Sequence, residues 1–126
     1  MRLIEIRRAD DGELEGFIAQ GPGEWLALTV FHGELGRARS RTAAAALVHA
    51  RGLAALAERW HWFSRRTREW QVVLPQECSP GRVRLAVGYY SLAGVPTATI
   101  TAADLAAGDR LVLERLAPDA EADPAG

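Results

Sequence analysis

The sequence predicts an α+β fold in which an antiparallel sheet of five to seven strands packs on one long helix. Two patterns support this class. Short segments near both ends of the chain alternate apolar and polar residues, as strands do, whereas the segment 42–67 repeats apolar side chains at spacings of three and four, as a helix does. The expected order is three strands, the long helix, and then further strands with a short helix before the last one.

The size and composition of the chain predict one domain. With 126 residues, of which 48% are hydrophobic and 25% are charged, it matches an average globular domain, which we expect over residues 1–116. Residues 117–126 hold three acids, two prolines and no large apolar side chain, so we expect a disordered tail there. No apolar stretch resembles a signal-peptide core or a membrane span, so we expect a cytoplasmic protein without a membrane partner.

Three strands are expected in the first third of the chain. Ile4 and Ile6 alternate with charged residues, as in a half-buried strand. The clusters Asp10–Gly12 and Gly21–Gly23 are typical of turns, because aspartate, glycine and proline favour tight reversals. The expected strands span Leu3–Arg8, Glu13–Gln20 and Trp25–Phe31.

A long helix is expected to run to about Thr67, with Ser40 or Thr42 as its N-cap. The side chains predicted to face the sheet are Thr42, Ala46, His49, Leu53, Leu56, Trp60, Phe63 and Thr67. Gly52 lies within this segment and costs a helix about 1 kcal/mol relative to alanine, so a break at this glycine is the alternative. Because the apolar stripe keeps its phase across Gly52, one continuous helix is favoured.

Strands are expected again in the last half. Thr101 and Asp104 have the spacing of a capping box, which predicts a short helix that Gly108 ends. The runs that are typical of strands are Gln71–Leu74, Val83–Tyr89, Thr97–Thr101 and Leu111–Leu116.

Charge is distributed unevenly along the chain. Residues 1–34 carry three arginines and seven acids, residues 35–68 carry eight arginines and one acid, and residues 69–126 carry four arginines and eight acids. The middle segment therefore has a net charge of +7 in a chain whose total is −1. Clustered arginines attract phosphate groups or an acidic protein surface.

The predicted helix places Trp62 among arginines on its solvent side, and a predicted strand places Arg82 and Arg84 near Tyr90. Guanidinium groups bind phosphate through paired hydrogen bonds and aromatic rings stack on bases, which suits single-stranded or flexible nucleic acid. We therefore predict a small nucleic-acid-binding accessory protein. The candidate nucleic-acid-binding residues are Arg41, Arg51, Arg59, Trp62, Arg65, Arg66, Arg82 and Arg84.

A second interpretation fits the same residues. An exposed tryptophan among arginines is also typical of a protein interface, and Glu69 can neutralise Arg65 one helical turn away. A protein-interaction or regulatory module without a nucleic-acid role is therefore the alternative. With four tryptophans and a polarised charge distribution, a homodimer is expected, since two-fold dimers dominate among soluble oligomers.

No motif for catalysis or metal binding is found in the sequence. It contains one cysteine, Cys78, and three histidines, none of which is paired with another at helical i, i+4 spacing. Neither a G-x-S-x-G motif nor a phosphate-binding glycine loop occurs. We therefore predict a non-enzymatic protein that has no metal and no cofactor.

Residues 13–60 resemble the arm-type DNA-binding domain at the front of phage integrases in two short motifs. One is GEWLALTVFHG, in which a tryptophan opens the third strand, and the other is the Ser-Arg-Thr-Ala at the start of the helix. In that family the sheet contacts DNA. Here the strand Trp25–Phe31 is apolar on both faces, so no site residue is taken from the resemblance.

Overall fold

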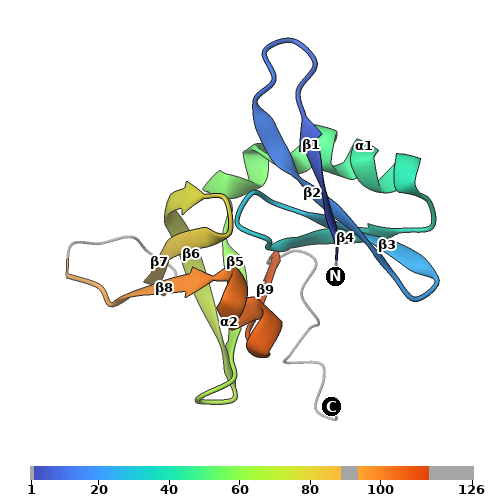
Figure 1. The fold of residues 1–126 in the computed structure, drawn as a ribbon. Coiled ribbons are helices and arrows are strands. Elements are labelled where there is room, and N and C mark those ends of the chain that lie inside the picture. Colours follow the sequence, from blue (N-terminus) through green and yellow to red (C-terminus); the bar gives the residue numbers. More distant parts are fainter. Residues whose placement is uncertain (1, 89–93, 114–126) are drawn as a thin grey trace.

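The computed structural model describes residues 2–88 and 94–113, which form a nine-stranded mixed sheet that curls into a half-barrel (Figure 1). The order across the sheet is β1-β2-β3-β4-β9-β5-β6-β7-β8. Neighbouring strands are antiparallel except for the parallel pair β4 and β9. The strands are β1 (Leu3–Arg7), β2 (Leu14–Gly21), β3 (Glu24–Leu28), β4 (Glu34–Ala38), β5 (Trp60–Ser64), β6 (Glu69–Ser79), β7 (Arg82–Val87), β8 (Thr97–Thr101) and β9 (Arg110–Leu113).

The prediction of an α+β fold with one long helix on a sheet is wrong. Strands make up 50% of the structure and helices only 20%, and no long helix packs on the sheet within the described ranges. The segment expected to be one helix forms instead the α-helix α1 (Arg41–Arg51), the 3-10 turn η1 (Ala54–Ala57) and then β5. The alternative of a break at Gly52 was therefore the better interpretation.

Strand β5 explains why the periodicity was misleading. Trp60, Trp62 and Ser64 are buried, whereas His61 and Phe63 between them are only partly covered, which is the period of two of a strand. Leu53, Leu56, Trp60 and Phe63 have helical spacing by coincidence, because apolar residues of the 3-10 turn precede those of the strand. A short apolar run of this kind fits both periods.

Helix α1 packs on one face of the first four strands (Figure 1). Ser40 caps it as expected, since its Oγ accepts a hydrogen bond from the Ala43 amide at 3.1 Å. A Cβ added to Gly16 of β2 would lie 2.9 Å from Val48 Cγ1 of the helix, which identifies the face of β2 toward α1. The opposite face holds a small separate apolar cluster of Phe17, Ala19 and Leu28.

The loop Thr29–Gly33 ties the first strands to the rest of the half-barrel. The Gly81 amide, in the turn between β6 and β7, donates to the Val30 carbonyl at 2.9 Å, and the Ala102 amide donates to the Gly81 carbonyl at 2.8 Å. Phe31 packs edge-on against Trp60 with ring centroids 5.1 Å apart, and both side chains are buried. One apolar core thus extends from α1 into the strands β5 to β9.

Several expected elements lie close to the observed ones. The strands near residues 3–8, 13–20, 82–87 and 97–101 are present, and Thr101 and Asp104 form the expected capping box at the start of α2 (Ala102–Ala107). Strand β4 lies in a segment for which no element was expected, and β6 continues through Pro75 with a register shift. The expectations for residues 89–90 and 114–126 fall outside the described residues. None of the described helices is long and apolar enough to cross a membrane.

Candidate nucleic-acid interface

The predicted arginine and tryptophan residues do not share one helix face. Arg41 and Arg51 are the first and last residues of α1, and Arg59 lies between η1 and β5. The other five belong to strands or to a turn, in a different part of the half-barrel. Trp62 is in β5, Arg65 and Arg66 are in the β5–β6 turn, and Arg82 and Arg84 are in β7.

Trp62 cannot act as the stacking platform that the sequence indicated. Its side chain points into the half-barrel and the residue is only 9% exposed. The indole Nε1–H donates a hydrogen bond to Oδ2 of the buried Asp109 at 2.9 Å. Trp62 is therefore a core residue with a satisfied polar atom.

Two arginines of the middle segment, Arg37 and Arg65, and Arg84 of β7 are paired with carboxylates within the protein. The Arg65 Nη1 lies 2.8 Å from Asp109 Oδ1 and 3.3 Å from Asp104 Oδ1, and these hydrogen bonds raise the pKa of the Arg65 guanidinium. Arg37 pairs with Glu24, and Arg84 with Glu77 at 3.1 Å. A guanidinium held by carboxylates has less free energy to gain from a phosphate.

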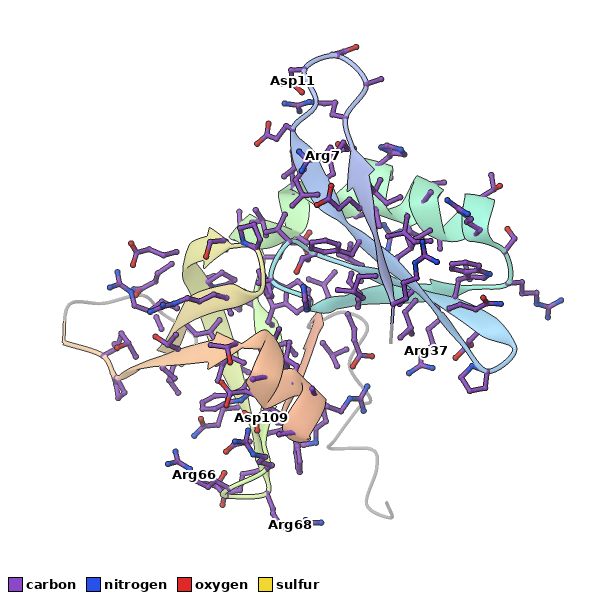
Figure 2. All side chains as sticks on the ribbon, viewed as in Figure 1. Arg7, Asp11, Arg37, Arg66, Arg68 and Asp109 are labelled. Atoms are coloured by element: carbon purple, nitrogen blue, oxygen red, sulfur yellow. The ribbon has the colours of Figure 1, made fainter. Side chains whose placement is uncertain are left out.

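Trp62, Arg65 and Arg66 do come together, in a polar cleft of about 400 Å³ that strand β8 also lines. Asp104 and Asp109 line the same cleft, so its two arginines face two carboxylates. Figure 2 shows Arg66 and Arg68 at the end of the molecule near Asp109, well separated from Arg37. This cleft therefore offers a polyanion no net attraction.

A second cleft, of about 490 Å³, combines arginine and tryptophan, and no acid is among its described lining residues. It is lined by Arg2, Ile4, Gln20, Trp25 and Arg41. Gln20 and Trp25 are directly opposed in the β2–β3 hairpin, on the face toward α1. Within the described part of the chain, neither Arg2 nor Arg41 forms an ion pair, and Trp25 is only partly buried.

The local fold explains how this cleft arises. Strand β4 ends at Ala38, and the Ser40 cap starts α1 at Arg41, so the helix covers the sheet from this point onward. Trp25 pairs across the sheet with Ala38, just where the helix begins. The indole therefore lies at the margin of the packed face, beside the first side chain of the helix.

Only Arg41 among the residues of this cleft belongs to the predicted set. Arg2 was missed because it precedes the first strand, and Trp25 was not selected because its strand is apolar on both faces. A signal for Trp25 was nevertheless present. A two-residue turn at Pro22 and Gly23 places Gln20 opposite Trp25, and a polar partner on the same face indicates partial exposure.

The chain matches no protein-family model, no curated protein and no solved structure. The resemblance to the arm-type domain of phage integrases thus gains no support from these comparisons, and the chain is assigned to no family.

Proposed function

We propose that this protein binds single-stranded or flexible nucleic acid through the cleft of Arg2, Trp25 and Arg41. One observation carries the proposal. A partly exposed indole lies in a cleft with two guanidinium groups, and among the described residues these groups have no counter-ion and the cleft has no acidic lining side chain. Aromatic rings that stack on bases beside arginines that bind phosphates are the recurrent elements of single-strand recognition.

Each side chain of the cleft has a defined part in this proposal. Trp25 offers an aromatic face to one base, and Gln20 beside it can both donate and accept hydrogen bonds at the edge of that base. Arg2 and Arg41 bind the flanking phosphates. A single strand is favoured over a duplex because only an unstacked base exposes its ring to a tryptophan.

The proposed binding is local rather than a property of the whole surface. The net charge of −1 gives no overall attraction for a polyanion. The affinity should therefore depend on the two arginines of the cleft, with about two phosphates neutralised. For single strands this predicts a slope of about −1.4 in a plot of log affinity against log salt concentration.

The test is a titration of short fluorescent DNA and RNA oligonucleotides at about 50 and 200 mM salt, followed by anisotropy. The slope above predicts an affinity about sevenfold lower at the higher salt concentration. The double variant Arg2→Ala/Arg41→Ala should lose most of the binding and most of the salt dependence. Its matched control, Arg66→Ala/Arg68→Ala, removes the same charge from the β5–β6 turn and should bind as the unmodified protein does.

Absence of binding at low salt would reject the proposal and would favour the alternative of a protein-interaction module. Equal losses of affinity in the two double variants would show that overall positive charge determines binding and that the cleft does not, which contradicts the proposed site.

A further inference from the structure

A third cleft lies on the face of the first strands that α1 does not cover. It has a volume of about 440 Å³ and lies between β3 and β4 on one side and α2 and β9 on the other. A mainly apolar cleft of this size with a few polar groups is typical of sites for small molecules. Its large apolar side chains are Leu3, Leu26, Leu28, Leu105 and Leu111.

His32 lines this cleft from a backbone conformation that is uncommon for a side chain other than glycine. Its φ angle is 70°, in the left-handed region, and hydrogen bonds of the loop hold it there. The His32 amide donates to the Thr29 carbonyl at 2.9 Å, and the Gly33 amide donates to Thr29 Oγ1 at 3.0 Å. Such conformations cost free energy and are concentrated at ligand sites.

Packing fixes the orientation of the His32 imidazole and leaves its ring nitrogens available to a ligand. Its ring packs edge-on against Phe17 with centroids 5.0 Å apart, which fixes its orientation. Neither ring nitrogen has a hydrogen-bond partner among residues 2–88 and 94–113. Burial lowers the pKa of His32 and so favours the uncharged ring, which offers one donor and one acceptor.

The charged side chains at this cleft are already paired within the protein. Glu34 accepts two hydrogen bonds from Arg110 Nη2, both at 3.0 Å. Arg37 pairs with Glu24 and lies 3.8 Å from Glu34. Asp109 binds Arg65, as described above. A charged ligand would have to compete with these pairs, whereas an uncharged ligand would not.

We propose that this cleft binds an uncharged, mainly apolar small molecule, such as a medium-chain alcohol, whose single hydroxyl group hydrogen-bonds to His32. The leucines bury the apolar part of the ligand, and the imidazole supplies the polar contact. This site is separate from the arginine cleft, because the two lie on opposite faces of the first strands. A variant that loses binding at one of the two clefts should therefore keep binding at the other.

The test is calorimetric titration at neutral pH with 1-octanol, octanoate and octyltrimethylammonium, which share a chain and differ in charge. Saturable binding of one octanol molecule per chain is expected, at least about tenfold tighter than binding of either ion. The variant His32→Asn should weaken octanol binding at least about fivefold, since asparagine tolerates the left-handed backbone but is too short to replace the ring.

Two tryptophan substitutions in α2 provide a matched pair. Ala106 lines the cleft, whereas Ala103 is exposed on the same helix and does not. Octanol binding should disappear in Ala106→Trp and persist in Ala103→Trp. Equal binding by the two variants, or equal binding of the alcohol and the ions, would overturn the proposal. Light scattering that gives the mass of two chains, falling to one chain in Ala106→Trp, would assign the cleft to a second copy and would also overturn it.

Discussion

Gly52 lies so close to the backbone of β2 that a Cβ at this position would be 2.3 Å from the Glu15 carbonyl oxygen. The same strand meets the end of α1 a second time, through the buried Glu15 carboxylate, whose Oε1 is 2.5 Å from His49 Nδ1. The end of the helix is therefore fixed by tertiary contacts with β2. Its position cannot be inferred from helix propensity alone.

The sign of the change in the free energy of unfolding on replacing Gly52 by alanine tests this contact. Helix propensity predicts that Gly52→Ala stabilises the protein by about 1 kcal/mol. The close approach to Glu15 predicts instead a loss of about 1–3 kcal/mol in the free energy of unfolding, as expected for an overpacked site. Urea denaturation measures the difference, and Ala46→Gly on the exposed side of α1 gives the propensity effect by itself. A more stable Gly52→Ala protein would refute the contact.

Asp109 is expected to stabilise the half-barrel through its buried hydrogen bonds. Its replacement by alanine leaves the buried Trp62 N–H without an acceptor, which costs about 1–3 kcal/mol. The control is Glu77→Ala, which breaks an exposed ion pair with Arg84 and should cost less than about 1 kcal/mol. If chemical denaturation gives the same loss for both variants, the hydrogen bonds of Asp109 contribute no more than a surface pair.

The lowered pKa values of two carboxylates predict a loss of stability in acid. The Thr101 amide donates to Asp104 Oδ2 at 2.9 Å and lowers the pKa of Asp104, while hydrogen bonds from Arg8 lower the pKa of Asp11 to about 2. Because an unfolded aspartate titrates near 3.9, these groups stabilise the fold above that pH. The contribution disappears as the pH falls through the lower folded pKa values.

The loss of stability in acid is measured as the free energy of unfolding in denaturant at several pH values between about 6 and 2. Asp104→Asn should be less stable than the unmodified protein at pH 6, and the difference should shrink toward pH 2. A difference that stays constant over this range would show that the charge of Asp104 is not involved. An NMR titration of Asp11 should give a pKa of about 2 that rises toward 3.8 in Arg8→Ala.

The parts of the fold that could be predicted are those that local chemistry determines. The turn at Gly21–Gly23 sets the β2–β3 pairing, and Thr101 with Asp104 sets the start of α2. The remainder depends on contacts between distant segments. Trp60–Ser64 becomes a strand because β9 and β6 pair with it on both sides, which no local pattern reveals.

The types of residue at the candidate site could be predicted from the sequence, but the positions that form the site could not. Charge asymmetry indicated arginines beside a tryptophan, yet Trp62 is buried and Arg65 is neutralised by Asp104 and Asp109. Those carboxylates lie some forty residues away in sequence, so no local pattern pairs them with Arg65. Trp25 and Arg41 meet only because α1 folds back over β3.

The most direct test of the nucleic-acid proposal is the affinity of Trp25→Ala for a short single-stranded oligonucleotide at about 50 mM salt. Loss of one base–aromatic stack should cost about 1–3 kcal/mol, which is about 5- to 150-fold in affinity. Trp70→Ala is the matched control, because Trp70 is also partly exposed but lies in β6, outside the cleft. Only Trp25→Ala is expected to weaken binding. Unchanged affinity in Trp25→Ala, or an equal loss in Trp70→Ala, would contradict it.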